Sequence, residues 1–245
     1  MRNITTFDFT SLGKYNKIYC LVSGGIDSTY LAEYISSLYP NKTYFVNCWN
    51  PYEQSQTLKH FKQSKMYIEI RPQKEIDYKQ ILDESFRKIP QAIELKKQHR
   101  YSKKVFPCCK FIKHNAFKRH PMFKEENTVV ISGIKYADGR QRQLWLKSLV
   151  NGKEYSKGTH ILNFPTFYHK HKEGQLYCYP FRDFPDRELP IDIIDKLRVK
   201  YPNLKHSGCV ICPVLVLFQN RIKNEPRVDI SVRYYNKIIG QKTIK

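Results

Sequence analysis

Ser23-Gly24-Gly25-Ile26-Asp27-Ser28 is the most informative stretch of this chain. It follows an apolar run over residues 18–22, typical of a buried strand, and precedes residues 29–38, which have helical spacing. A strand, a glycine-rich turn and a helix start form a phosphate cradle in that order. The first N–H groups of a helix lack partners within the helix, and its dipole favours an anion. Because the glycines let the backbone approach closely and the serines add hydroxyl donors, the stretch predicts a phosphate-binding loop.

The loop differs from a Walker A loop, which carries a lysine just after its second glycine. Asp27 stands where that positive charge would be expected. Because a carboxylate repels polyphosphate unless a cation lies between them, we interpret Asp27 as a residue that organises magnesium or hydrogen bonds. The alternative interpretation is an ordinary Ser/Gly turn in which Asp27 caps the following helix.

Strand-like and helical patterns alternate along the first part of the chain. The expected strands are 18–22, 43–49, 66–70 and 128–132, and the expected helices are 29–38, 54–63, 78–89 and 110–119. This alternation predicts an α/β fold with a doubly wound, mostly parallel sheet. Ligands of such sheets bind beyond the carboxyl ends of the strands, where the Ser23–Ser28 loop and residues 133–142 both fall.

The pattern changes after residue 142. We therefore expect a nucleotide-binding core over residues 1–142 and a small irregular or helical part over residues 143–245, which together form one compact unit. The second part is rich in aromatic residues, Gly and Lys at its start. Its expected elements are a hairpin, 159–164 with 175–181, and helices at 190–200, 214–222 and 228–239.

The chain of 245 residues is strongly basic, with 43 Lys and Arg against 22 Asp and Glu and a net charge of +21. Such a charge favours an anionic partner, and nucleic acid, either tRNA or DNA, is the first candidate, followed by a nucleotide. The alternative is coding bias, because the chain is also rich in Ile, Asn and Tyr. Neither a leader-like apolar segment nor a run long enough to span a membrane is seen, so we expect a cytoplasmic protein.

Basic residues cluster in three runs, the first at residues 96–104, the second at 110–119 and the third at 169–172. Tyr101, Phe106 and Phe111 interleave with the first two runs. Aromatic side chains between cations suit the stacking of bases. The alternative is that these aromatic residues belong to the core.

Two of the seven cysteine positions form a pair of neighbours, Cys108-Cys109, and two more form the Cys-x-x-Cys motif of Cys209 and Cys212. Because structural disulfides are disfavoured in a cytoplasm, grouped cysteines indicate metal or redox chemistry. Four thiolates suit zinc or an iron–sulfur cluster, and a cluster with several irons accepts adjacent cysteines more easily. The alternatives are two small buried side chains for Cys108-Cys109 and a redox pair for the motif.

The Ser23–Ser28 stretch resembles the pyrophosphate-binding loop of the PP-loop ATP pyrophosphatases, which share the adenine nucleotide alpha hydrolase-like fold. Those enzymes split ATP between its α and β phosphates and transfer AMP to a substrate. Together with Cys108-Cys109, residues 133–142 and residues 207–213, the loop follows the motif order of the phosphoadenosine phosphosulfate (PAPS) reductase-like family. This resemblance spans residues 17–215. It implies a four-iron four-sulfur cluster held by Cys108, Cys109, Cys209 and Cys212.

A second candidate anion-binding loop follows the strand expected at 128–132, and the alternative is a solvated basic loop, because exposed Arg and Lys side chains are common. Gly133, Lys135, Arg140 and Arg142 concentrate positive charge there, and guanidinium groups suit phosphate. The segment resembles the Gly-Ile-Arg segment of the family, with Lys135 in place of the usual arginine. Asn47, at the end of the second expected strand, is a candidate contact for adenine or ribose.

These features together predict an enzyme that binds ATP and Mg²⁺ and adenylates a nucleic acid or nucleotide for sulfur transfer, with a sulfur donor protein as a further partner. Asp27, Lys135 and Arg140 are the expected catalytic residues. A PAPS reductase is a competing hypothesis, but no cysteine follows Cys212 to act as the tail nucleophile of that family. A nucleic-acid-binding protein without catalysis also competes, and so does an adenylating enzyme that holds zinc at its cysteines.

Overall fold

The computed structural model describes residues 9–53, 57–72, 74–138, 142–144, 146, 168–170, 176–182, 189–202, 204, 208–221 and 225–240. The chain divides into two compact units whose segments alternate along the sequence. The first, here called the sheet unit, comprises residues 1–47, 55–68 and 121–207. The second, here called the cysteine unit, comprises residues 48–54, 69–120 and 208–245.

Six strands form one sheet in the part of the chain that the structure describes, in the order β3-β2-β1-β4-β6-β5. Five of them run parallel, and the edge strand β5 runs antiparallel to β6. This arrangement confirms the prediction of an α/β fold with a mostly parallel sheet. The strands are β1 Lys17–Leu21, β2 Thr43–Cys48, β3 Tyr67–Ile70, β4 Thr128–Ile131, β5 Tyr168–Lys170 and β6 Leu176–Cys178.

The order of the strands reverses at β1. Ile18 of β1 faces Thr43 of β2 on one side and Val129 of β4 on the other. The chain therefore adds β2 and β3 on one side of β1 and then adds β4 on the opposite side. Such a switch point opens a crevice at the carboxyl ends of the two strands that flank it, and ligands of α/β sheets bind there.

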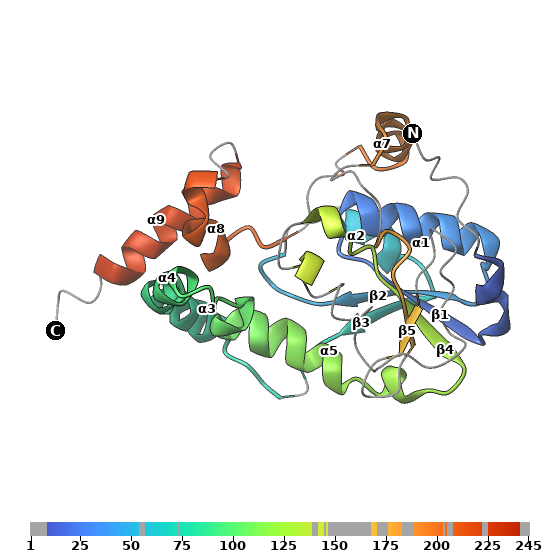
Figure 1. Ribbon diagram of the computed structural model, residues 1–245, viewed down its shortest axis with the longest axis horizontal. Coiled ribbons are helices and arrows are strands. Elements are labelled where there is room, and N and C mark those ends of the chain that lie inside the picture. Colours follow the sequence, from blue (N-terminus) through green and yellow to red (C-terminus); the bar gives the residue numbers. More distant parts are fainter. Residues whose placement is uncertain are drawn as a thin grey trace. The chain divides into compact units, whose positions relative to one another are not determined.

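The sheet unit buries its apolar strands beneath helices. Three consecutive residues of β1, Ile18, Tyr19 and Cys20, are buried, so both faces of this strand are covered. Helices α1 Ile26–Leu38, α2 Thr57–Lys62 and α7 Ile191–Lys200 contribute to a core with β1 and β4, and Figure 1 shows α1 and α2 beside the sheet. The core members from these helices are Leu31, Ala32, Ile35, Leu58, Phe61, Ile193, Ile194 and Leu197.

The cysteine unit is helical. Its α-helices are α3 Tyr78–Arg87, α4 Ile89–Lys97, α5 Ala116–Arg119, α8 Pro213–Leu217 and α9 Pro226–Gly240, and residues Cys108–Asn115 form a π-helix. Asp77 caps α3, since its carboxylate accepts a hydrogen bond from the backbone N–H of Gln80 at 2.9 Å. The core of this unit contains Leu82, Phe86, Ile89, Ala92, Tyr101, Phe106, Val216, Leu217 and Ile238.

Several elements differ from the sequence-based expectations. The helix expected at 78–89 ends at Arg87 and a second helix, α4, begins at Ile89, whereas the helix expected at 110–119 begins with the π-helical turns. β6 joins the main sheet beside β4, and residues 159–164 lie outside the described ranges. Short 3-10 segments link the larger elements, at Thr10–Lys14, Lys103–Val105, Pro121–Lys124, Tyr136–Asp138 and Gln219–Arg221. Within the described residues, no helix combines the length and the apolar character that a membrane span requires.

Candidate functional site

The Ser23–Ser28 loop connects the end of β1 to the start of α1. Gly24 has a φ of 75°, and Gly25 caps the helix in an extended conformation. The Ser28 hydroxyl closes the loop, because it donates to the Gly25 carbonyl at 3.0 Å and accepts from the Ser23 backbone N–H at 3.2 Å. The hydroxyls of Ser23 and Ser28 lie 3.1 Å apart. The two serines predicted as phosphate donors therefore shape the loop as well.

We expect Gly24→Ala to lower the free energy of unfolding by about 1–2 kcal/mol, because a Cβ is disfavoured at positive φ. Gly13→Ala is the matched control in the same unit. A Cβ at Gly13 would meet the Tyr39 ring at 3.5 Å, an ordinary contact. Urea unfolding followed by circular dichroism measures both variants, and equal stabilities for the two would contradict the strained geometry of the loop.

Gly133 brings the segment after β4 against this loop. A Cβ at Gly133 would lie 3.4 Å from the Cβ and the carbonyl carbon of Asp27 and from the backbone nitrogen of Ser28. Gly133 therefore packs against the backbone at the start of α1, and the ends of β1 and β4 lie close together at the switch point. Two segments far apart in the sequence meet at one edge of the sheet, as the motif positions predicted.

Lys135 and Asp27 form an ion pair at this meeting point. The Lys135 ammonium lies 2.9 Å from Asp27 Oδ1, and its side chain is fully buried while that of Asp27 is 30% exposed. The backbone N–H of Lys135 donates to the Asp138 carboxylate at 3.2 Å. The positive charge that the loop itself lacks is thus supplied by a residue from another strand end. The sequence identified both residues as site candidates, but it did not predict their pairing.

Asn47, Arg140 and Arg142, the other residues predicted to contact the nucleotide or its phosphates, differ in burial and in their partners. Asn47 is buried, and its amide donates to the Val22 carbonyl at 2.7 Å, so it fixes the start of the loop. Arg142 is exposed, and its positive charge opposes the rise that burial imposes on the pKa of Tyr179. Arg140 lies outside the described residues.

The four predicted metal ligands line one small cavity in the cysteine unit. Its free space has room for about one water molecule. The π-helix supplies Cys108 and Cys109, and Cys212 caps α8. A short antiparallel bridge holds Cys209 opposite Glu53, where the N–H of Val210 donates to the Tyr52 carbonyl at 2.7 Å. The cavity is lined by Asn50, Tyr52, Leu82, Cys108, Cys109, Lys113, Cys209, Ile211, Cys212 and Pro213.

The cysteines interact in two pairs, and each pair contains one acidic thiol. A hydrogen bond from Cys209, helped by the backbone N–H groups of Val214 and Leu215, lowers the pKa of Cys212 to about 7 despite burial. A hydrogen bond from Cys109 likewise lowers the pKa of Cys108. The Cys209–Cys212 pair can therefore carry a thiolate near neutral pH, the state in which sulfur binds a metal, and the pKa of Cys108 is shifted in the same direction.

Two residues that the sequence did not mark as site residues face these thiols. The Asn50 amide donates to the Cys209 sulfur at 2.9 Å, and the Lys113 ammonium lies 3.2 Å from Glu53 Oε2. Burial disfavours the charge of Lys113, but electrostatic attraction to Cys209 and to the Glu53 carboxylate outweighs burial and raises its pKa. The position of Lys113 four residues after Cys109 on a helical element could have indicated this role.

The donor set fits a thiophilic metal. The described residues contain no group of three or more Cys, His, Asp or Glu side chains arranged to hold one metal ion, so the four sulfurs line the cavity without converging on one point. Zinc and an iron–sulfur cluster both accept four thiolates. The remaining cysteines lie apart from the cavity lining: Cys20 and Cys178 are buried, and burial raises the pKa of Cys48 to about 11.

No protein-family model matches the sequence, and a search of curated proteins finds no relative. The described fold and its geometry define an α/β protein with a glycine-rich loop at the switch point of a parallel sheet. The loop, the ion pair and the cysteine cavity therefore provide the basis for a functional proposal.

Proposed function

We propose that this chain is a PP-loop ATP pyrophosphatase-type enzyme of the PAPS reductase-like kind, which adenylates a nucleic acid or nucleotide for sulfur transfer. The observation that carries the proposal is the Lys135–Asp27 ion pair of 2.9 Å, set beside the Ser23–Ser28 loop at the switch point of the sheet. Glycine-rich backbone, serine hydroxyls and a buried ammonium group provide donors for a polyphosphate.

The loop would hold the β and γ phosphates of ATP, which arrives with its magnesium ion. An oxygen of the acceptor attacks the α phosphorus, and the bond between that phosphorus and the oxygen bridging to the β phosphate breaks. The electron pair of that bond leaves with pyrophosphate, and AMP remains on the acceptor. Negative charge grows on the departing pyrophosphate, so donors already fixed around the loop lower the barrier. Asp27 keeps the Lys135 ammonium in place for this purpose.

The cysteine cavity supports the sulfur-transfer part of the proposal. Cys108, Cys109, Cys209 and Cys212 would hold a zinc ion or an iron–sulfur cluster. When bound, zinc held by four thiolates would link the two cysteine pairs, and an iron–sulfur cluster would in addition supply an electron carrier. Asn50 and Lys113 then contribute a hydrogen bond and a positive charge beside the sulfur of Cys209.

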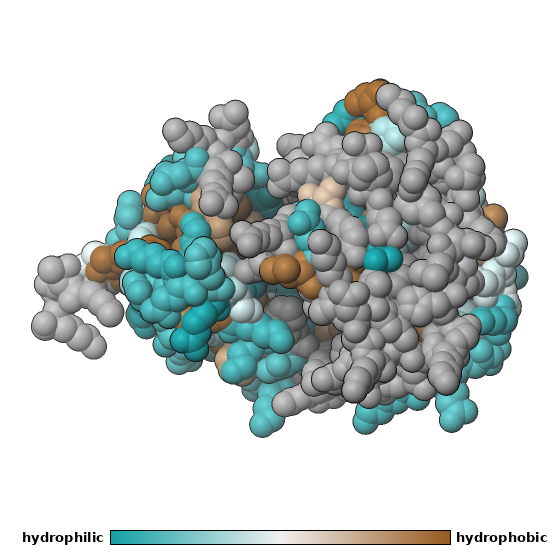
Figure 2. Space-filling view, in the orientation of Figure 1, coloured by the Kyte–Doolittle hydropathy of each residue, from teal (hydrophilic) through white to brown (hydrophobic). Residues whose placement is uncertain are grey.

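The charge distribution supports nucleic acid as the acceptor. The cysteine unit has 21 Lys and Arg residues and 9 Asp and Glu residues, a net charge of +12 out of +21 for the whole chain. Hydrophilic side chains cover much of the visible surface over α3 and α4, as Figure 2 shows. The smaller unit therefore carries more than half of the net charge, which suits a phosphate backbone.

We expect the anaerobically purified chain to convert ATP into AMP and pyrophosphate when an acceptor is present. The test incubates ATP labelled at the α phosphate with tRNA, single-stranded DNA, duplex DNA or nucleotides and separates the products. The α,β-methylene analogue of ATP is the control, since its carbon bridge blocks the cleavage. Formation of ADP and orthophosphate would contradict the proposal, and release of sulfite from a sulfonucleotide with a thiol and no ATP would favour the reductase.

A further inference from the structure

A second pocket of the cysteine unit lies on the same π-helix as the cysteine pair. It has a volume of about 360 Å³, within the range of small-molecule sites. The π-helix contributes Cys108, Cys109 and Lys113 to the cysteine cavity and Phe111 and Asn115 to this pocket. π-helical turns are frequent at functional sites, and this one contributes side chains to two cavities.

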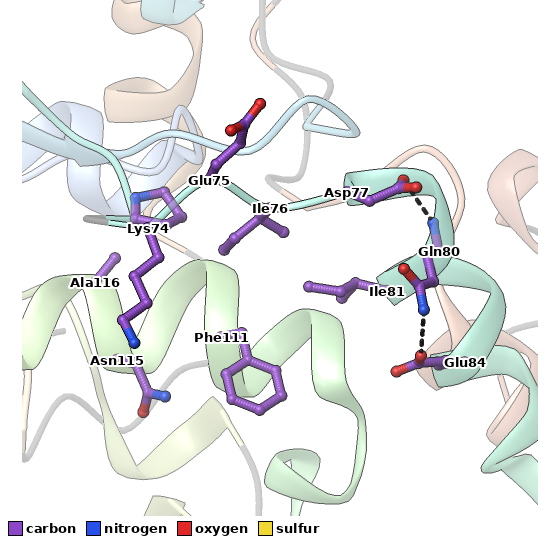
Figure 3. A pocket seen from close by; sticks show the side chains of 11 residues that line it. Lys74, Glu75, Ile76, Asp77, Gln80, Ile81, Glu84, Phe111, Asn115 and Ala116 are labelled. Atoms are coloured by element: carbon purple, nitrogen blue, oxygen red, sulfur yellow. Dashed lines mark hydrogen bonds between the residues drawn. The ribbon is translucent and has the colours of Figure 1, made fainter.

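The pocket has an apolar middle with an exposed aromatic ring. Phe111 is 40% exposed, although Tyr101 and Phe106, the other aromatic residues among the basic runs, are buried in the core. Figure 3 shows Phe111, Ile76 and Ile81 between the polar side chains that line the pocket. A ring exposed beside branched aliphatic side chains offers a surface for a flat apolar group.

Polar side chains lie at the two ends of this apolar middle. Lys74 and Asn115 lie at one end of the view in Figure 3, and Gln80 and Glu84 lie at the other. The Gln80 side chain donates to Glu84 Oε1 at 3.2 Å. The two ends therefore offer amide and carboxylate oxygens as hydrogen-bond acceptors.

We propose that this pocket binds an unpaired nucleobase with an exocyclic amine, adenine, cytosine or guanine, of a single-stranded nucleic acid. The base would stack on Phe111, and its amine would donate to the carboxylate and amide oxygens at the ends of the pocket. This inference takes from the proposed function only that the acceptor is a nucleic acid. It adds that the cysteine unit binds the acceptor through one unpaired base.

Charge complementarity favours this occupant. Asp77 and Glu84 line the pocket together with a single ammonium group, that of Lys74, while the Glu75 carboxylate points away from the apolar middle in Figure 3, so a phosphate inside the pocket would meet an excess of negative charge. A neutral base that donates hydrogen bonds is not repelled, and carboxylates accept from the amine of cytosine. Outside the lining, Lys110 is exposed, with its Nζ 5.1 Å from the centre of the Phe111 ring. It can meet the phosphate that flanks a stacked base.

The test measures the binding of labelled twelve-nucleotide oligomers by fluorescence anisotropy without ATP. Oligomers of dC, dA and dT are compared with an abasic oligomer to distinguish binding of the base from binding of the backbone. Oligomers of rC and rU show whether the affinity differs between DNA and RNA. We expect dC, dA and rC to bind more tightly than dT, rU and the abasic chain. Phe111→Ala should weaken the binding of dC at least about fivefold, because stacking contributes strongly for each base.

Phe111→Tyr and Phe111→Leu are the control variants. The tyrosine keeps a flat ring and should keep the affinity, whereas the leucine keeps apolar volume without the ring and should lose affinity as alanine does. Glu84→Gln should reduce the preference for dC over dT. Equal binding of dC and the abasic chain, or unchanged affinity in Phe111→Ala, would overturn the proposal. Because no ATP is present, these results do not depend on whether the chain releases pyrophosphate.

Discussion

Lys135→Met is expected to reduce pyrophosphate release from ATP by at least about a hundredfold, the effect of removing one fixed donor to developing charge. The Lys135 side chain is fully buried, and its ammonium lies 2.9 Å from Asp27 Oδ1 beside the glycine-rich loop. Methionine has a similar length, fills the same space and carries no charge. The free energy of unfolding should therefore change by only about 1 kcal/mol, because Asp27 is partly exposed and water can reach it.

Asp27→Asn is expected to lower both the free energy of unfolding and the rate of pyrophosphate release. It removes the carboxylate that the buried Lys135 ammonium contacts at 2.9 Å, and the loss of one partner of a buried ion pair costs about 3–5 kcal/mol. The double variant Asp27→Asn with Lys135→Met removes both charges and should recover much of that stability without recovering activity. Calorimetry and urea unfolding give the stabilities, and the ATP assay gives the rates.

Lys17→Met provides the matched control in the same unit. Lys17 pairs with Glu125 at 2.7 Å, but both side chains are 39% exposed. An ion pair of this kind contributes about 0–1 kcal/mol, so stability and pyrophosphate release should both stay near their original values. Full activity in Lys135→Met would show that this ammonium group does not act on the phosphates, and the proposed roles of Lys135 and Asp27 would then be wrong.

Replacing any one of Cys108, Cys109, Cys209 and Cys212 by serine is expected to remove most of the metal that the anaerobically purified chain holds. All four thiols line one cavity, and a structural metal site loses most of its affinity when a thiolate is lost. Metal analysis, acid-labile sulfide and the visible absorption spectrum give the readout. Iron with matching sulfide identifies a cluster, whereas zinc without sulfide identifies the zinc-bearing form.

Cys48→Ser is the control for this series. The Cys48 thiol donates to the Ile112 carbonyl at 3.3 Å, and burial raises its pKa to about 11, so it stays protonated. A serine hydroxyl can make the same hydrogen bond, and the metal content should remain. A purified chain without metal, or equal metal loss in Cys48→Ser and the four cavity variants, would contradict a four-cysteine site.

Local sequence pattern predicted much of the fold. The bounds of β1, β2, β3 and β4 lie within one residue of the strands expected from apolar runs, because alternation and β-propensity act over a few residues. The loop after β1 was also predicted from local sequence, since two glycines before a helical pattern indicate a helix start near a phosphate site. The break between α3 and α4 coincides with Pro90 in the first turn of α4, which is a local signal of a helix boundary, but the second helix after it was not predicted.

The sequence predicted the candidate catalytic and metal-binding residues, but it did not predict which residues they contact. Lys135 and Asp27 are separated by 108 residues, and Asn50 and Cys209 by 159. Contacts at such separations depend on the order of the strands and on which loops meet, which no local period encodes. Tyr101, Phe106 and Phe111 likewise looked alike in sequence, and only packing distinguished the buried pair from the exposed ring.

The sequence by itself determined the alternating elements, the glycine-rich loop, the charge and the two cysteine pairs, since each depends on neighbouring residues. Only the tertiary structure decided that Lys135 neutralises Asp27, that four thiols line one cavity and that Phe111 faces a pocket. The physical reason is that burial and ion pairing depend on which distant segments meet when the chain folds, and that meeting is set by the whole fold.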